Sequence, residues 1–139
     1  MGLPYAEDVG HYWQTSSSSP DTWLEKAKKL IRQLEGNIVA EGYGSLGEHA
    51  AYMLAFEVGG DSFKVVWPVL PSRTGKELAA KRQAATLLYH DIKAKAMTAS
   101  VLGTRAAFFS YMMLSDGRTA TELTSPELSR EFPLQLKGG

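Results

Sequence analysis

The side chains that could act as acids, bases or nucleophiles are few and scattered in this chain. His11, His49 and His90 are its three histidines, the side chains whose ordinary pKa lies nearest to neutral pH. Each falls in a different predicted element, with no orienting partner beside it in the sequence. The sequence contains no cysteine and no Gly-x-Ser-x-Gly turn that would present a nucleophilic serine. We therefore expect a non-catalytic protein.

The motifs that hold metals or phosphates are incomplete. His90 and Asp91 are neighbours on a predicted helix, so their side chains diverge by about 100° and do not converge on one ion. Residues 72–76, SRTGK, resemble the end of a phosphate-binding loop, but the first glycine is missing and Glu77 stands where Ser or Thr is needed. The free N–H groups at this helix start form, at most, an isolated anion site. We expect no cofactor and no metal ion.

Basic side chains are concentrated in one third of the chain. The formal net charge is zero, yet residues 73–105 carry seven Lys and Arg against two Asp and Glu. Most of these cations fall on one predicted helix, and both side-chain types bind phosphate groups. This asymmetry favours a polyanionic partner. We predict a nucleic-acid-binding site made by Arg73, Lys76, Lys81, Arg82, Lys93, Lys95 and Arg105.

The aromatic residues near this helix in the sequence leave two interpretations open. Exposed rings at Tyr52, Phe63, Trp67 or Tyr89 would stack on nucleic-acid bases. The alternation along the predicted strands instead directs Phe63 and Trp67 into the core, which is the interpretation that we favour for these two. The basic helix has a similar alternative, in which its charged face is only solvated.

The first element that positions these residues is an amphipathic helix. Ser19 is a suitable N-cap, Pro20 suits the first helical position, and Gly36 supplies the stop. Between them, residues 23–34 place apolar side chains at three- and four-residue spacing, which gives the helix one apolar side.

Three strands are predicted after this helix. Residues 37–43 form a short first strand, and residues 50–58 alternate in side-chain type along a second. A Gly-Gly-Asp turn at residues 59–61 leads into a third strand at residues 63–69. The simplest product is a three-stranded antiparallel meander.

The longest predicted element carries most of the basic residues. Thr74 and Glu77 have the spacing of a capping box, and no glycine or proline interrupts the chain from Leu78 to Leu102. A helix of some 27 residues is about 40 Å long, which is longer than a small sheet needs. Either its end projects, or it packs on a partner. The predicted fold class is α+β: a helix, a three-stranded antiparallel meander, and a long basic helix packed on the sheet.

The chain after Gly103 allows two interpretations. Residues 105–114 could continue as helix, but their aromatic residues and the following Ser-Asp-Gly-Arg turn favour a hairpin that pairs residues 106–114 with residues 119–123. The predicted organisation is a flexible N-terminal arm at 1–19, one domain at 20–124 and a tail at 125–139. Tyr12 and Trp13 indicate that part of the arm packs on the domain or on a neighbour.

This order of elements resembles two families of nucleic-acid-binding domains. Asp91, Lys93, Lys95, Ala96 and Gly103 are similar to a pattern in the long helix of Rad52-type single-strand annealing domains, although Ala94 separates the basic pair here. The double-stranded RNA-binding domain has the same order in a shorter form, and its basic final helix is loosely similar at residues 76–82. The resemblance covers residues 20–103 and implies a non-catalytic domain that binds nucleic acid.

Two functions of different classes follow from these observations, and a third is kept open. The first is single-stranded DNA binding or annealing of phage or recombination type, by a homo-oligomer. The second is an oligomeric structural or interaction protein that binds no nucleic acid. The third is an enzyme or small-molecule binder, which needs a pocket, and no motif in the sequence indicates one. The sequence has no signal-peptide pattern and no apolar run that could span a bilayer, so we expect a cytoplasmic protein without a membrane partner.

Overall fold

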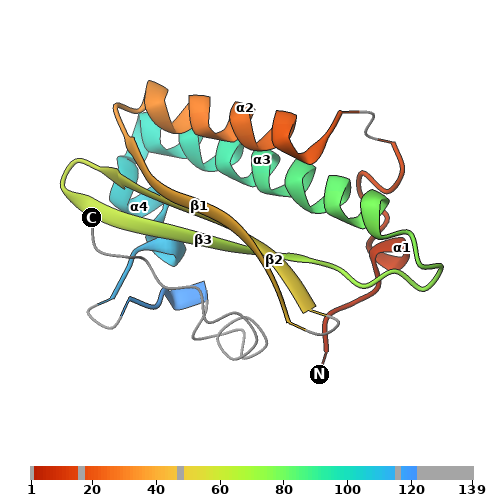
Figure 1. Cartoon of the computed structure of the whole chain (residues 1–139). Helices are drawn as coiled ribbons and strands as arrows, with labels where there is room; N and C mark the ends of the chain where they lie inside the picture. Colours follow the sequence, from red (N-terminus) through yellow and green to blue (C-terminus); the bar gives the residue numbers. More distant parts are fainter. Residues whose placement is uncertain (1, 16–17, 47–48, 115–116, 122–139) are drawn as a thin grey trace.

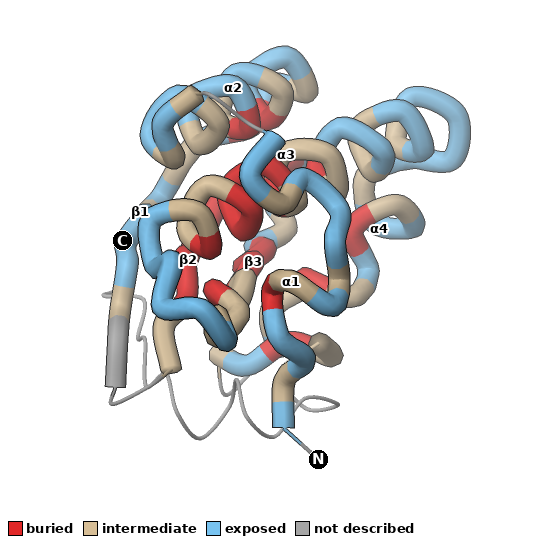
Figure 2. Tube along the Cα trace, turned by 90° about the vertical axis from the view of Figure 1, so that its right-hand side faces the viewer, coloured by how far each residue is buried: buried red, intermediate tan, exposed pale blue. Residues whose placement is uncertain are grey.

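A three-stranded sheet with two long helices along one of its faces forms the centre of the computed structural model (Figure 1). The helices cover the same face, and most of the buried chain lies between them and the sheet (Figure 2). The structure describes residues 2–15, 18–46, 49–114 and 117–121.

The sheet is the predicted antiparallel meander. Its strands β1 (Asn37–Leu46), β2 (His49–Val58) and β3 (Asp61–Val69) pair in the order β1-β2-β3. Gly59 and Gly60 both adopt positive φ in the turn between β2 and β3, a conformation that glycine reaches without steric cost. The α+β fold class expected from the alternation of side chains is confirmed.

The two long helices lie side by side above the sheet. They are α2 (Pro20–Gln33) and α3 (Glu77–Leu102), which pack closely on each other. Ser19 caps α2 as predicted, because its hydroxyl accepts a hydrogen bond from the Thr22 N–H at 3.3 Å. The apolar spacing of α2 is accounted for by its contact with α3 and β1, where Ala27 and Ile31 are fully buried.

The core between helices and sheet takes up several of the aromatic side chains. Phe63 is completely buried and packs on Phe56, with ring centroids 5.5 Å apart. Tyr52 is also almost entirely buried, while Trp67 and Tyr89 are half-buried against the core. The favoured interpretation of Phe63 as a core residue is confirmed, and stacking of a base on its ring is excluded by its burial.

The opposite face of the sheet is buried as well. Ala51, Met53 and Ala55 of β2 form a small second cluster with Val66 of β3, and Ala40 of β1 packs against it. The middle strand is therefore buried on both faces. This explains why β2 is a nearly continuous apolar run, since a strand with one wet face would alternate apolar and polar side chains.

The N-terminal arm packs on the domain through a short helix, α1 (Ala6–Val9). The Ala6 N–H donates to the Pro71 carbonyl oxygen at 2.8 Å. The buried Gln83 of α3 donates through Nε2 to the carbonyl oxygens of Ala6 and His11, both at 3.1 Å. The aromatic residues of the arm thus correctly indicated that part of it packs on the domain.

The start of α3 differs from the prediction. The helix begins at Glu77, and Thr74 does not cap it. The Ser72 hydroxyl instead accepts from the Lys76 N–H at 3.1 Å, and the Glu7 carboxylate of α1 accepts from the Thr74 N–H at 3.2 Å. The predicted capping box is wrong, because a carboxylate from a distant part of the chain binds the polar groups that precede the helix.

The chain after α3 also differs from the predicted hairpin. Gly103, with φ of 91°, ends α3, and the short helices α4 (Thr104–Ala107) and η1 (Phe109–Tyr111) follow. Phe108 between them is fully buried against the Phe56 and Phe63 rings, so this segment turns toward the core instead of extending. The strand predicted over residues 106–111 is therefore wrong. The bridge between Met113 and Thr119 is the part of the hairpin that the described chain contains, and the predicted tail at 125–139 lies outside it.

Candidate nucleic-acid interface

Three of the seven predicted basic site residues form ion pairs within the chain. Arg73 Nη1 lies 2.8 Å from Asp8, Lys95 Nζ lies 3.0 Å from Asp91, and Arg105 Nε lies 3.1 Å from Asp61. Each pair is partly exposed, so it is a weak contact in energy. The carboxylate nevertheless neutralises the field of its cation. These three residues are therefore less available to bind phosphate than the count of basic residues in the sequence indicated.

The other four predicted residues have different surroundings. Lys76 and Lys93 are exposed. The Lys81 ammonium lies over the ring of Tyr43 on β1, 4.8 Å from its centroid. Arg82 is half-buried, and its Nε is a buried donor without a partner among the described residues. Since 26 residues of α3 span about 39 Å, the seven cations do not form one compact site.

A compact group of rings and cations exists elsewhere, where the N-terminal arm meets α2 and α3. We call it the aromatic–basic cluster. It consists of Tyr12 from the arm, Trp23 and Lys26 from α2, and Tyr89, His90 and Lys93 from α3.

The rings of this cluster are in direct contact. Tyr12 and His90 are stacked with centroids 4.8 Å apart and planes 4° from parallel. Trp23 meets Tyr89 at 5.2 Å and His90 at 5.8 Å. The Lys26 ammonium lies 4.4 Å from the centroid of the Trp23 ring, a cation–π contact. Four aromatic side chains from three segments therefore form one contiguous group, in which Tyr12 is exposed and the other three are half-buried.

The backbone holds Tyr12 in an unusual conformation. Its φ of 58° is in the left-handed region, which costs a residue with a side chain about 1–3 kcal/mol. The preceding residue, His11, is fixed by the hydrogen bond from Gln83. Tyr12 is still 37% exposed although one face of its ring is stacked on His90. The arm thus presents an aromatic ring to solvent and backs it with a second ring.

Two lysines set the electrostatics of the cluster. Desolvation lowers the pKa of His90, and the charges of Lys93 and Lys26 lower it further. His90 is therefore neutral at physiological pH, where an uncharged imidazole stacks on Tyr12. The positive charge of the cluster comes from Lys26 and Lys93, which are both exposed.

Part of this cluster is predictable from the sequence. Lys93 is among the predicted site residues, Tyr89 is among the candidate stacking rings, and Tyr12 is one of the two arm residues expected to pack on the domain or on a neighbour. Trp23, Lys26 and His90 were interpreted only as helix or surface residues. The three- and four-residue spacing assigns Trp23 to a helix stripe, but it carries no information on which residues of α3 lie opposite.

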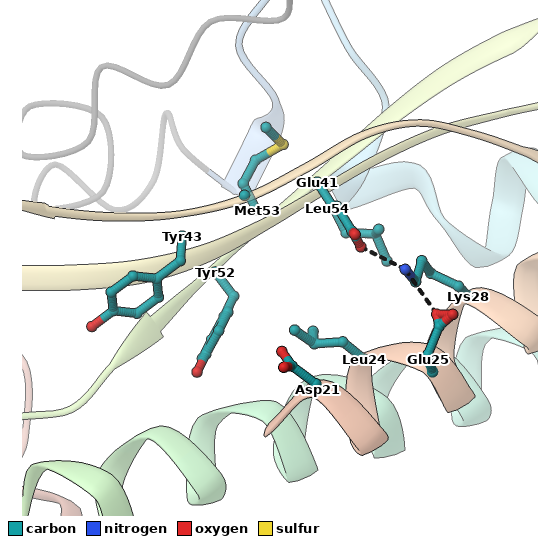
Figure 3. A pocket seen from close by; sticks show the side chains of 10 residues that line it. Asp21, Leu24, Glu25, Lys28, Glu41, Tyr43, Tyr52, Met53 and Leu54 are labelled. Carbon is teal, nitrogen blue, oxygen red and sulfur yellow. Dashed lines mark ion pairs between the residues drawn. The ribbon is translucent and has the colours of Figure 1, made fainter. Parts of the chain in front are cut away.

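A pocket of about 510 Å³ lies on a different side of α2, between this helix and strands β1 and β2 (Figure 3). Its lining includes Asp21, Tyr43 and Tyr52. No motif in the sequence predicted it. Within the described part of the chain, no three metal-ligating side chains come together, and no helix is long and apolar enough to cross a bilayer.

Comparisons with models of protein families, with curated proteins and with solved structures found no match for this chain. The geometry of the aromatic–basic cluster and the distribution of charge are accordingly the features of the molecule that bear on its function.

Proposed function

We propose that this protein binds single-stranded nucleic acid, in the first instance single-stranded DNA, without catalysing a reaction. The observation that carries the proposal is the aromatic–basic cluster, in which the exposed Tyr12 ring, backed by three half-buried rings, lies near two exposed lysines. Proteins that bind single strands without sequence preference combine these two features. The excess of positive charge between residues 73 and 105 supports it.

Each part of the cluster has a role in this proposal. A base of an unpaired strand stacks on the exposed side of Tyr12, which His90 supports from behind. Lys26 and Lys93 neutralise the phosphates on either side of that base. Duplex DNA keeps its bases stacked on one another, so it gains only the phosphate contacts. A preference for the single strand follows.

Fluorescence anisotropy with a labelled single-stranded oligonucleotide, and with its duplex, tests the proposal at about 50 and 200 mM KCl. The double variant Lys26→Ala, Lys93→Ala should weaken binding and lower the slope of log affinity against log salt by up to about 1.4, because two phosphate contacts are lost. Tyr12→Ala should weaken binding of the single strand by about 1–3 kcal/mol and leave the salt slope nearly unchanged, because stacking releases no counterions.

Lys29→Ala combined with Arg32→Ala is the matched control. Both residues are exposed on α2 and lie outside the cluster, and the change in charge is the same as in the test pair. This control should bind as the wild-type protein does. Equal loss in both double variants would mean that the attraction is diffuse, and absence of binding by the wild-type protein would reject the proposal.

An oligomeric interaction protein is the second candidate function, and a specific surface favours it. Four large apolar side chains at the far end of α3 and in η1 are more than 60% exposed: Met97, Val101, Leu102 and Phe109. Residues 96–102 carry no charged side chain. A two-fold interface brings the same patch of both copies together. A second copy of this chain could therefore pack on this uncharged surface without placing like charges opposite one another. We propose that the homo-oligomer forms here.

Light scattering tests this assembly. Val101→Glu should convert an oligomer into a particle near the 15.2 kDa of one chain, because a two-fold contact would bring the two introduced carboxylates together. Gln33→Glu, an exposed position on α2, is the matched control and should leave the mass unchanged. A wild-type protein that is already monomeric at tens of micromolar would reject the second-copy interface.

A further inference from the structure

The pocket between α2 and the sheet has the size and lining of a ligand site. Its volume of about 510 Å³ lies in the range of sites that hold small molecules. Leu24 from α2 and Met53 and Leu54 from β2 supply apolar walls. Tyr43 and Tyr52, with ring centroids 5.0 Å apart, form one end (Figure 3).

The charges that line this pocket are unbalanced. Three carboxylates face one lysine, because Asp21, Glu25 and Glu41 share the lining with Lys28. The Lys28 ammonium lies 2.8 Å from both Glu25 and Glu41, and these two hydrogen bonds raise its pKa. Asp21 has no cation paired with it in the described part of the chain. The lining residues themselves therefore include more carboxylates than cations, with Asp21 as the unpaired carboxylate, and Lys81 is a further cation beside Tyr43.

An unpartnered hydroxyl group at the end of a buried side chain is the second, independent observation. Tyr52 is only 7% exposed, and its side chain points into the pocket (Figure 3). In the residues that the structure describes, its hydroxyl has no hydrogen-bond partner. Desolvation raises the pKa of Tyr52 to about 12, with Tyr43 and Asp21 adding to the effect. The group is therefore a neutral phenol, free to donate or accept a hydrogen bond.

We infer that this pocket binds a small organic cation, a protonated amine on an apolar body, with its ammonium group between the Asp21 carboxylate and the Tyr43 and Tyr52 rings. Aromatic faces and an unpaired carboxylate are the groups that bind ammonium ions. The Lys81 ammonium already lies over one face of the Tyr43 ring, so the Asp21 carboxylate and the Tyr52 side chain are the groups that attract the ammonium of the ligand. The apolar body of the ligand lies against Leu24 and Leu54. This site is independent of the proposed nucleic-acid function.

The experiment uses tryptamine as the probe and tryptophol as its neutral counterpart. The two molecules share the indole body and differ in an ammonium against a hydroxyl group. Binding is followed by amide shifts in the NMR spectrum of the full chain. We expect tryptamine to shift the amides of residues 41–43 and 52–54, and to bind at least about tenfold more tightly than tryptophol, because only the ammonium group forms a charge-assisted hydrogen bond with Asp21.

Two conservative variants locate the site. Asp21→Asn should weaken tryptamine binding about tenfold, and Tyr52→Phe, which keeps the ring, should weaken it about fivefold. Glu57→Gln, an exposed carboxylate on β2 outside the pocket, is the control for the loss of one charge and should bind normally. Equal affinity for tryptamine and tryptophol, undiminished binding by Asp21→Asn, or no shifts at all would each overturn the inference. All three outcomes are independent of whether DNA binds.

Discussion

One carboxylate organises the junction between the N-terminal arm and the long helix. Glu7 accepts hydrogen bonds from the Ser72 hydroxyl at 2.7 Å and from the Arg73 N–H at 3.1 Å. It also accepts from the N–H of Thr74 at 3.2 Å and from its hydroxyl at 2.7 Å. A single carboxylate thus accepts hydrogen bonds from the N–H and hydroxyl groups that precede α3, in place of a local helix cap. Partial desolvation acts to raise the pKa of Glu7, but these hydrogen bonds outweigh it and lower the pKa to about 2.

The lowered pKa of Glu7 predicts a dependence of stability on pH. Because the folded pKa lies below the ordinary value of 4.5, the stabilisation is complete above that pH and is lost as the pH falls toward 2. Glu7→Gln should therefore lower the free energy of unfolding at pH 6, and its difference from the wild-type protein should shrink between pH 4.5 and 2. Urea denaturation at several pH values measures this. Glu57→Gln should show no such convergence, and a constant difference for Glu7→Gln would contradict the assignment.

A similar contact fixes the chain that follows the long helix. The Tyr111 hydroxyl donates to Asp91, which also pairs with Lys95, and the Lys95 ammonium lies 5.0 Å from the centroid of the Tyr111 ring. Burial raises the pKa of Tyr111, and the charge of Asp91 and its hydrogen bond act in the same direction. Tyr111→Phe should lower the free energy of unfolding by about 1–3 kcal/mol, because a buried hydrogen bond to a carboxylate is lost. Urea denaturation checks the value, and an unchanged midpoint would show that this contact contributes nothing.

At the scale of elements, two adjacent residues, Glu35 and Gly36, together form the C-terminal end of α2. Glu35 adopts the left-handed conformation with φ of 64°, and its N–H donates to the Arg32 carbonyl at 2.9 Å. The Gly36 N–H donates to the Ile31 carbonyl at 3.0 Å, which completes a Schellman motif. A Cβ atom at Gly36 would lie 2.7 Å from the Ile31 side chain and 2.9 Å from Val58. Close packing thus requires glycine at position 36. At position 35, where the left-handed backbone favours glycine, the residue is glutamate.

Two substitutions at this helix end should have opposite effects. Gly36→Ala should destabilise the protein by about 1–3 kcal/mol, because the added methyl group clashes with the core. Glu35→Gly should stabilise it by about 0.5 kcal/mol, since relief of the left-handed conformation exceeds the added entropy of the unfolded glycine. Thermal denaturation of both variants distinguishes them. Two changes of the same sign would show that the C-terminal motif of α2 is not as described.

At the scale of the whole molecule, the aromatic–basic cluster joins three segments that are far apart in the sequence. Its formation in solution can be tested without any nucleic acid, because His90 reports on it. Lys26→Ala with Lys93→Ala should raise the pKa of His90 toward its ordinary value of 6.5, since two repelling charges are removed. Tyr12→Ala should also raise it, because the imidazole becomes more hydrated.

NMR titration of the His90 ring measures these shifts. The double variant Lys29→Ala, Arg32→Ala serves again as the control and should leave the pKa of His90 unchanged. If the arm did not pack on α3 in solution, Tyr12→Ala would have no effect. The titration therefore separates an incorrect structure of the cluster from an incorrect proposal about what it binds.

Local patterns in the sequence were enough to predict the elements themselves. The strand-forming residues of β2 and β3, the Gly59–Gly60 turn and the cap at Ser19 all depend on residues within a few positions of one another. The length of α3 was predicted to within a few residues for the same reason, because no glycine or proline interrupts it before Gly103. These features are set by backbone preferences and side-chain periodicity, which act over short distances along the chain.

Only the tertiary structure decided what the charged and aromatic side chains contact. Glu7 is hydrogen-bonded to Thr74, 67 positions away in the sequence, and Gln83 is hydrogen-bonded to Ala6, 77 positions away. Side-chain periodicity carries no information about contacts at such separations. The same holds for the ion pair of Arg105 with Asp61, for the stacking of Tyr12 on His90, and for the pocket under α2. A charge in the sequence gives the sign of a field, but its partners are set by the packing of distant segments. That is why the basic residues could be counted from the sequence and their availability for a ligand could not.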